Sequence, residues 1–188
     1  MVSSCLKIRP VNENIVQVIE DICDSASAYI NYKGLSFIFD TSHEEIIVSF
    51  DPDSIERKIL NLLSNSIKFT PRGGKIFVYI ELSKDNVYIT VKDTGIGIPE
   101  NVQGTIFNRF VQAENAKNAN KNGSGIGLAL VKSLTELHGG NISLYSKINE
   151  GTTFTISIPN RKTDTILTLD SNLDTSKSDK VDFEFSDL

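Results

Sequence analysis

The chain of 188 residues has only two cysteines, Cys5 and Cys23, and they stand far apart in the sequence. This number and spacing exclude a disulfide framework and a cysteine-rich metal site, and they favour a reducing compartment. No apolar run approaches the length of a membrane span, and residues 1–20 lack the hydrophobic core of a signal peptide. Basic residues do not predominate, because the net charge is −5, which argues against a non-specific nucleic-acid binder. We therefore expect a soluble, cytoplasmic portion that contacts neither nucleic acid nor membrane.

Hydrophobic residues make up 39% of the chain and charged residues 23%, which is ordinary for one globular domain with a substantial core. The patterned part of the sequence covers residues 14–160, which we interpret as that domain. Residues 1–13 are irregular and are interpreted as a linker. Residues 161–188 are rich in Ser, Thr and Asp and are predicted to form a mostly disordered acidic tail, although the alternation over residues 181–185 favours a short strand.

Residues 51–70 predict the central helix of the domain. Their apolar residues recur at the spacing of one helical face, and Asp51 and Pro52 supply a start signal. The opposite face is unusual, since Asn61, Asn65 and Lys68 stand at i, i+4 and i+7 and form one polar column. Asparagine is a poor helix former, so two of them in mid-helix cost stability. A solvated face is the ordinary interpretation of such a column, and a row of side chains aimed at a charged ligand is the alternative.

The rest of the domain alternates between helical and strand patterns, separated by glycines, a proline and polar turns. We predict an α/β (α+β) fold, a two-layer sandwich in which three main helices lie on one side of a mixed β-sheet. The predicted helices are residues 14–31, 53–68 and 126–138, with a weak helical piece after Pro99, and the predicted strands are residues 35–40, 46–50, 75–82, 86–93, 141–146 and 152–158.

A first glycine motif, DTGIGIP over residues 93–99, follows one of the predicted strands. Gly95 and Gly97 would let the backbone approach a flat or bulky ligand, because they carry no Cβ atom. Asp93 stands at the strand end, where a carboxylate can accept a hydrogen bond from an exocyclic amine such as that of adenine. A glycine turn with a capping aspartate is the alternative interpretation.

A second glycine motif, NGSGIGL over residues 122–128, opens the last predicted helix directly. Backbone N–H groups and the positive end of the helix dipole at such a position suit a phosphate, and Gly123, Gly125 and Gly127 keep the approach open. The motif is neither a Rossmann nor a P-loop pattern, because no strand leads into it and no Gly-Lys-Ser/Thr follows. The preceding residues 112–124 are almost wholly polar and predict a mobile functional loop.

Together these motifs occur in a fixed order that resembles the ATP-binding catalytic domain of sensor histidine kinases. The matching stretches are NLLSNSIKFTPRGG, DTGIGIP, IFNRFVQ, GSGIGLAL and EGTTFTISIP, and the resemblance covers residues 14–159. The superfamily also includes gyrase, MutL-type repair ATPases and the large heat-shock chaperone, and its Bergerat-type ATP-binding fold is a two-layer sandwich. The resemblance implies ATP and Mg²⁺ as cofactors and a place in two-component signal transduction.

The resemblance also implies roles for individual residues. Asn65 would hold Mg²⁺, and Asn61 and Lys68 would face the phosphates beside it, so that these three residues form the catalytic set. The other implied ATP contacts are Asp93 and Thr152 at the adenine amine, Gly95 and Gly97 under the base, Gly123, Gly125, Gly127 and Leu128 around phosphate, and Phe107, Arg109 and Phe110 at the lid, with Arg109 a further candidate for the terminal phosphate.

One departure separates this chain from the hydrolysing members of the superfamily. Those relatives place a glutamate one turn before the Mg²⁺ asparagine to activate water, whereas this chain has Asn61 there. An amide cannot take a proton from water at neutral pH, so the sequence favours phosphotransfer over hydrolysis. Two alternatives stay open on the same fold, a serine kinase of the anti-sigma type and a non-catalytic, ATP-regulated binding module.

No candidate phosphoacceptor is expected among the two histidines. His43 lies between two predicted strands rather than on a long helix, and His138 precedes a glycine helix stop, where histidine suits the helix dipole. The resemblance therefore implies a histidine-containing dimerisation domain outside this chain, in cis or in trans, as the immediate partner, and a response regulator downstream. A sensor of this kind can be membrane-anchored elsewhere in its sequence.

Overall fold

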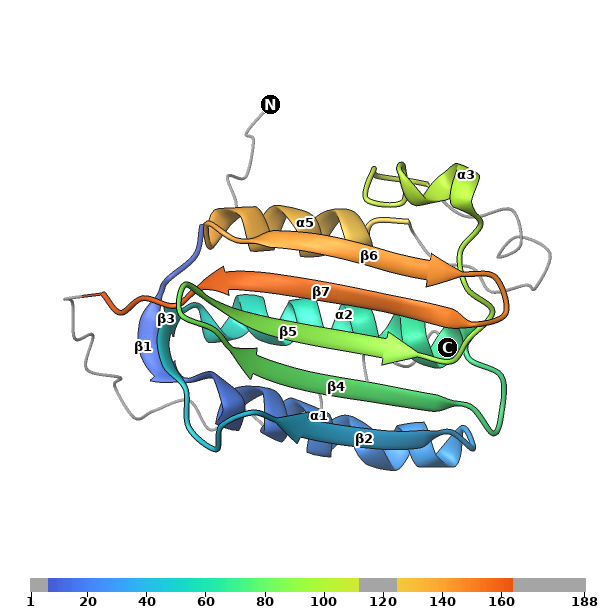
Figure 1. Ribbon diagram of the computed structural model, residues 1–188, viewed down its shortest axis with the longest axis horizontal. Helices are drawn as coiled ribbons and strands as arrows, with labels where there is room; N and C mark the ends of the chain where they lie inside the picture. The colour runs from blue at the N-terminus through green and yellow to red at the C-terminus, as the bar shows by residue number, and fades with distance from the viewer. Residues whose placement is uncertain (1–6, 112–124, 164–188) are drawn as a thin grey trace.

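The computed structural model describes residues 7–111 and 125–163, which form two layers. One layer is a five-stranded mixed sheet. The other consists of the helices α1 (Ile15–Tyr32), α2 (Pro52–Phe69) and α5 (Gly127–Leu137), which cover one face of that sheet (Figure 1). The predicted two-layer α/β sandwich is confirmed. The short helix α3 (Glu100–Gln103) follows Pro99, where the sequence predicted a weak helical piece.

The main sheet has the strand order β2-β4-β5-β7-β6, in which β2 pairs in parallel with β4 and the other neighbours pair antiparallel. The bounds are Ser36–Thr41 for β2, Lys75–Leu82 for β4, Asn86–Asp93 for β5, Asn141–Lys147 for β6 and Gly151–Pro159 for β7. Alternate residues of β5 and β7 are buried, because only one face of the sheet packs against the helices. The register places Asp93, at the end of β5, opposite Thr152, near the start of β7.

The central helix α2 extends one residue beyond the predicted range of 53–68 at each end. It begins after Asp51, whose side chain accepts a hydrogen bond from the Ser54 amide at 3.0 Å, and Pro52 occupies its first turn. The side chains of its apolar face are fully buried against the core, namely Ile55, Ile59, Leu62 and Leu63. This buried face holds the polar column of the helix in a fixed position relative to the end of β5.

A second sheet pairs β1 (Val11–Asn14) antiparallel with β3 (Ile47–Phe50). Our interpretation of residues 1–13 as an irregular linker is therefore wrong for residues 11–13. The short β1 is half-buried throughout and contains one strongly apolar residue, so no local alternation reveals it. Asn12 also binds the segment that follows β7, since it donates to the Thr163 carbonyl at 2.6 Å and accepts from the Thr163 amide at 2.9 Å.

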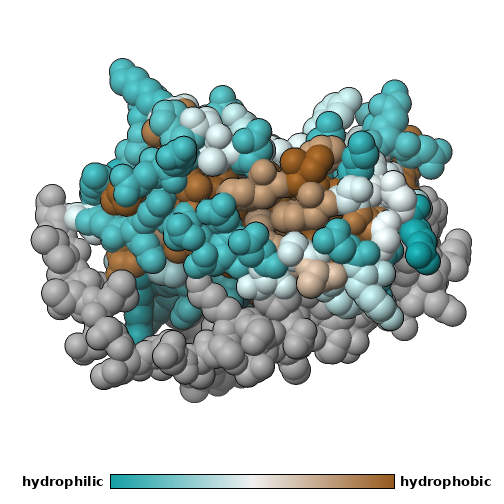
Figure 2. All heavy atoms as spheres, turned by 90° about the horizontal axis from the view of Figure 1, so that it is seen from below, coloured by the Kyte–Doolittle hydropathy of each residue, from teal (hydrophilic) through white to brown (hydrophobic). Residues whose placement is uncertain are grey.

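Strand β2 forms one edge of the main sheet, above α1. Phe37 and Phe39 are half-buried against the core, and Ile38 on the other face is 43% exposed. Seen from this edge, the molecule carries a band of apolar surface between hydrophilic side chains (Figure 2). The strand is only six residues long and exposes Asp40, and both features limit pairing of an open edge with other chains.

Several predictions concern residues outside the described ranges. These are the loop of residues 112–124 with Gly123, most of the tail, and the strand-like run of residues 181–185. Among the helices of the described ranges, none is long and apolar enough to cross a membrane.

Candidate functional site

Asp93 lies at the end of β5, where three hydrogen-bond donors hold its carboxylate. Oδ1 accepts from the amides of Gly95 at 2.9 Å and Thr152 at 3.2 Å, and Oδ2 accepts from the Ser66 hydroxyl at 3.1 Å. The residue is only 5% exposed. A carboxylate oxygen has room for two donors, and Oδ2 receives fewer of these three bonds than Oδ1. Oδ2 is therefore the atom suited to accept a further hydrogen bond from a ligand amine.

The electrostatic setting of Asp93 agrees with that role. Burial raises the pKa of its carboxyl group, and the hydrogen bonds from Gly95, Ser66 and Thr152 oppose the rise. A ligand N–H group at Oδ2 would add a fourth donor and stabilise the charged form further. A buried carboxyl group with a perturbed pKa at the end of a strand is a common feature of functional sites.

The glycines after Asp93 are required for backbone packing. A Cβ atom on Gly95 would lie 2.6 Å from the Phe69 carbonyl oxygen at the end of α2. Gly97 has a φ of 71°, and a Cβ atom there would lie 2.1 Å from the Lys147 carbonyl oxygen at the β6–β7 turn. The two glycines therefore let the turn fit between α2 and the last hairpin, a reason that the sequence alone did not indicate.

The predicted polar column lies on α2, and all three of its side chains are half-buried. Asn61 Nδ2 donates to the Arg57 carbonyl at 2.8 Å, and the amide oxygen of Asn61 faces the first turn of α5. The Lys68 ammonium lies 5.6 Å from the centre of the Phe69 ring. Two amides and one cation are thus accessible from one side of the helix, and the helix is anchored through its other side.

The first turn of α5 adjoins this column. A Cβ atom on Gly127 would lie 2.3 Å from Asn61 Oδ1, so the absence of a side chain at Gly127 allows the two helices to approach. Among the residues that the structure describes, no side chain caps this end of α5, and no acidic residue stands in its first turn. Its first backbone N–H groups, among them that of the half-buried Leu128, have no partner within the helix, and they lie with the positive end of the helix dipole beside Asn61. An anion is the ligand that such an arrangement favours.

The lid residues predicted from the sequence, Phe107, Arg109 and Phe110, lie just before the segment 112–124. Phe107 is anchored to the core by an edge-to-face contact with Phe154, with ring centroids 6.1 Å apart. The Phe110 amide donates to the Gly125 carbonyl at 2.9 Å, so the two ends of the segment are joined. Phe110 is 74% exposed and has a φ of 65°, a strained conformation for a bulky residue. Arg109 is exposed beside it.

Sequence reasoning missed Ser66, which binds the Asp93 carboxylate. The available signal was its position, because it interrupts the apolar stripe of α2 at i+3 from Leu63 and i+4 from Leu62. Ser66 is 2% exposed, and a buried hydroxyl in an apolar stripe needs a hydrogen-bond partner. The partner itself lies 27 residues further along the chain and could not be read from local pattern.

The donor set fits a weakly held divalent cation. Within the described residues, no three His, Cys, Asp or Glu side chains gather into a metal site. The amide oxygens available on α2 are hard ligands, which Mg²⁺ accepts when a bound phosphate supplies the remaining charge. The residues therefore fit Mg²⁺ that enters together with a phosphate ligand, with Asn65 as the predicted protein ligand.

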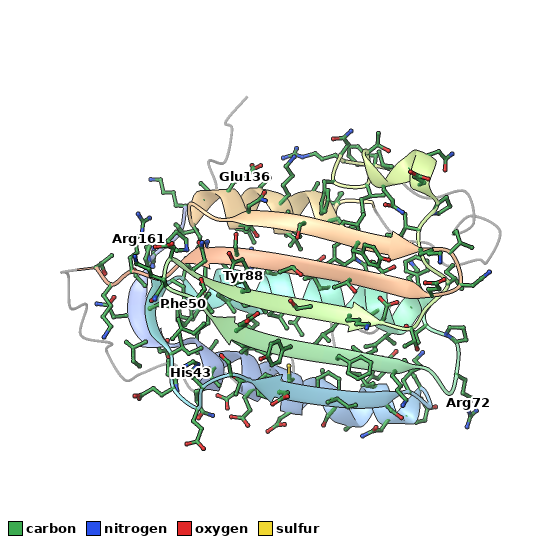
Figure 3. The ribbon with its side chains drawn as sticks, in the orientation of Figure 1. His43, Phe50, Arg72, Tyr88, Glu136 and Arg161 are labelled. Carbon is green, nitrogen blue, oxygen red and sulfur yellow. The ribbon has the colours of Figure 1, made fainter. Side chains whose placement is uncertain are left out.

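The two histidines lie away from this arrangement. His43 follows β2, whose last residue Thr41 pairs with Ile80, whereas Asp93 pairs with Ile76 at the other end of β4. Figure 3 shows His43 at that opposite end of the sheet. His138 is buried after α5; its Nε2 accepts from the Asp51 amide at 3.1 Å, and its Nδ1 lies 2.7 Å from the Leu134 carbonyl. These contacts make His138 a neutral structural residue, and burial lowers its pKa further.

Comparison with known proteins agrees with this geometry. Residues 50–162 match the family described as histidine kinase-, DNA gyrase B-, and HSP90-like ATPases. The chain is 36% identical to histidine kinase P4 of Formosa agariphila over 161 residues, which cover 84% of this chain and 12% of that kinase. It is 43% identical to the circadian input-output histidine kinase CikA of Synechococcus elongatus over 109 residues, which cover 58% of this chain and 14% of CikA. The chain thus spans a small part of the length of these relatives.

Solved structures show the same fold. The nucleotide-free catalytic domain of histidine kinase ThkA superposes with a TM-score of 0.73 at 26% identity, covering 82% of this chain and 99% of that one. ThkA in complex with the response regulator protein TrrA gives a TM-score of 0.67 at 25% identity, covering 80% of this chain and 42% of that one.

Proposed function

The chain belongs to the family of histidine kinase-, DNA gyrase B- and HSP90-like ATPases, and we propose that it is the ATP-binding catalytic domain of a protein-histidine kinase. In this role it binds ATP with Mg²⁺ and transfers the γ-phosphoryl group to a histidine of a dimerisation domain outside this chain.

The contact between α2 and α5 carries this proposal. The amide oxygen of Asn61 faces Gly127, so the polar column of α2 and the first turn of α5 border one space. Side-chain amides, the Lys68 ammonium and backbone N–H groups are the kinds of group that hold phosphates. Ser66, next to Asn65 on the same helix, donates to Asp93. A purine site and a phosphate site therefore lie along one helix.

The catalytic role of these residues is to position ATP and to balance its charge. Asp93 accepts the adenine amine through Oδ2, with Thr152 beside it. Asn61, Lys68 and the first amides of α5 hold the phosphates, and Arg109 is a candidate for the terminal one. Mg²⁺, when bound at Asn65, supplies charge neutralisation on the phosphate oxygens.

The residue at the position of Asn61 determines which nucleophile reacts. An amide cannot remove a proton from water, so this chain has no general base one turn before Asn65. Water is then a poor nucleophile, and a histidine nitrogen brought by a partner attacks the γ-phosphorus in its place, while the bond to the β–γ bridging oxygen breaks and ADP leaves. The dimerisation domain supplies that histidine in cis or in trans.

A response regulator is the proposed next acceptor. The names of the relatives and the complex of ThkA with a response regulator protein support this step. Two-component transfer of this kind would take place in the cytoplasm, where ATP is available.

Asn65→Ala is expected to remove the Mg²⁺-dependent part of the affinity for the non-hydrolysable analogue AMP-PNP, a loss of about tenfold to 100-fold. Affinity measured with EDTA in place of Mg²⁺ should change little, because the adenine contacts are intact. Titration calorimetry of the full chain gives both values. Ser64→Ala, a change at the neighbouring half-buried position of α2, is the matched control.

The transfer step is tested with radiolabelled ATP and an added histidine-containing dimerisation domain. Label that is acid-labile and depends on the acceptor histidine supports the proposal. Tight AMP-PNP binding without transfer to any such domain would instead favour an ATP-regulated binding module, and acid-stable label on serine would favour a serine kinase.

Gly127→Ala is expected to weaken AMP-PNP binding by about tenfold, because the added methyl group must displace Asn61 from the phosphate space. The double variant Asn61→Ala with Gly127→Ala removes the clash, so the cost of the second change should then be smaller. Equal costs in both backgrounds would show that Gly127 does not act through Asn61.

A further inference from the structure

Ser146 on β6 joins the purine site to the segment that leads into the lid. Its Oγ atom lies 2.8 Å from the Ile98 amide, 2.9 Å from the Gly151 carbonyl oxygen and 3.0 Å from the Thr152 hydroxyl. Ser146 belongs to none of the ATP contacts described above. One hydroxyl group thus meets three polar groups, and one of them belongs to the residue that accompanies Asp93.

The chemistry of these groups fixes the direction of each hydrogen bond. A serine hydroxyl carries one hydrogen and can accept two more. The Ile98 amide can only donate, and the Gly151 carbonyl can only accept, so Ser146 accepts from the first and donates to the second. The third contact is then a hydrogen bond only if the Thr152 hydroxyl donates to Ser146. This arrangement satisfies all three contacts, and the reverse direction would lose the bond to Gly151.

Ser146 is held in place from outside the purine site. Gln103 of α3 donates through Nε2 to the Ile98 carbonyl at 2.7 Å and to the Ser146 carbonyl at 3.0 Å. Gln103 therefore fixes the backbone of Ser146 relative to Ile98. The Ser146 hydroxyl oxygen then cannot easily move when the Thr152 side chain rotates.

The direction of the Thr152 bond matters for the choice of base. With its hydrogen taken by Ser146, Thr152 Oγ1 keeps only lone pairs for a ligand, and the neighbouring Asp93 carboxylate is also an acceptor. Adenine carries an amino group at the position where guanine carries a carbonyl oxygen. A pair of acceptors attracts the amino group and repels the carbonyl oxygen.

We propose that Ser146 is a specificity-determining positioning residue, which holds the Thr152 hydroxyl hydrogen and so keeps the purine site selective for adenine over guanine. The inference rests on the proposed ATP-binding function and adds to it the origin of base selectivity. In the absence of Ser146 the Thr152 hydroxyl can turn and donate to a guanine carbonyl.

The test is the ratio of the dissociation constants for GMP-PNP and AMP-PNP, measured by calorimetry on the full chain with Mg²⁺. Ser146→Ala is expected to lower this ratio about threefold to tenfold, because one acceptor–acceptor repulsion becomes a hydrogen bond. Ser146→Thr keeps the hydroxyl and should keep the ratio. Ser143→Ala makes the same change at an exposed position of β6 and should leave the ratio within about twofold.

A packing role for Ser146 would give a different result. Ser146→Ala would then weaken both analogues equally and leave the ratio unchanged, which overturns the inference. In a Thr152→Val background the responsible hydroxyl is gone, so Ser146→Ala should change the ratio no further; a persistent change there also overturns it. If Ser146→Ala does not fold, Ser146→Cys provides the same test, since a thiol is a weak acceptor.

Failure of the proposed function has its own signature. Wild-type protein that binds neither analogue, or whose AMP-PNP affinity is indifferent to Asp93→Asn, contradicts ATP binding itself. Wild-type protein that prefers AMP-PNP through Asp93, but keeps that preference unchanged in Ser146→Ala, contradicts only the role of Ser146.

Discussion

Asp93→Asn is expected to lower the affinity for AMP-PNP by about 100-fold or more, while the domain stays folded. The asparagine oxygen can still accept from the Gly95 and Thr152 amides at the place of Oδ1. Its NH₂ group then replaces Oδ2, where it donates to the Ser66 oxygen and faces the adenine amine donor to donor. The substitution removes one ligand acceptor and retains the local hydrogen bonds of the fold.

Calorimetry gives the affinity, and thermal unfolding gives the stability of the same variant. Because burial raises the pKa of Asp93, the ionised carboxylate costs stability at neutral pH, and the neutral asparagine should leave the unfolding temperature unchanged or raise it. The exposed Asp85→Asn is the matched control and should alter neither quantity. An Asp93→Asn variant that binds AMP-PNP within a few-fold of the wild type would exclude Asp93 as the adenine contact.

The helices and the main sheet could be predicted from the sequence because their signals are local. The apolar stripe and the Asp51 cap specify α2, and the alternation in β5 and β7 follows from the single buried face of the sheet. The strand β1 was missed because it depends on pairing with β3, about 35 residues away, and not on its own apolar pattern. A strand this short that forms by pairing with a distant partner shows no alternation of apolar and polar residues in its own sequence.

The residues of the candidate site also divide into those with a local sequence signal and those without one. The sequence itself shows that Asp93 stands at the end of a strand and that the polar column on α2 has helical spacing. Ser66 and Ser146 act through hydrogen bonds to residues that are distant in sequence or in other elements, so their roles appear only in three dimensions. Gly95 and Gly97 follow β5 as the sequence predicted, but their close neighbours are protein carbonyl groups, which no motif specifies.

The N-terminal half of α2 contains a buried charge that the proposed activity does not use. Lys58 is fully buried, and its ammonium group has no hydrogen-bond partner among the described residues. Burial lowers its pKa to about 7, and the nearby Asp51 opposes that shift. His138 of the α5 terminus stands in the same cluster, where burial and the Lys58 charge lower its pKa. The N-terminal half of α2 therefore holds a costly charged group among buried side chains that are mostly apolar.

Lys58→Met is expected to raise the free energy of unfolding at pH 7 by about 2 kcal/mol or more, since methionine fills a similar volume without a charge. The unfolded lysine has its ordinary pKa of 10.5, and the folded one has a pKa of about 7. Between these values the unfolded chain binds more protons, so wild-type stability should rise as the pH increases from 7 towards 10.5. Below pH 7 lysine is charged in both states and the full cost remains.

The free energy of urea unfolding at pH 7, 8 and 9 separates the cost of the buried Lys58 charge from an effect of side-chain repacking. The wild type should gain stability across the series, and Lys58→Met should be more stable at pH 7 and change less with pH. The exposed Lys75→Met removes the same charge from the surface and should keep the wild-type slope. A Lys58→Met variant that is less stable than the wild type, or that retains its slope, would show that the ammonium group has a stabilising partner. The expected result instead makes Lys58 a source of alkaline stabilisation in the N-terminal half of α2.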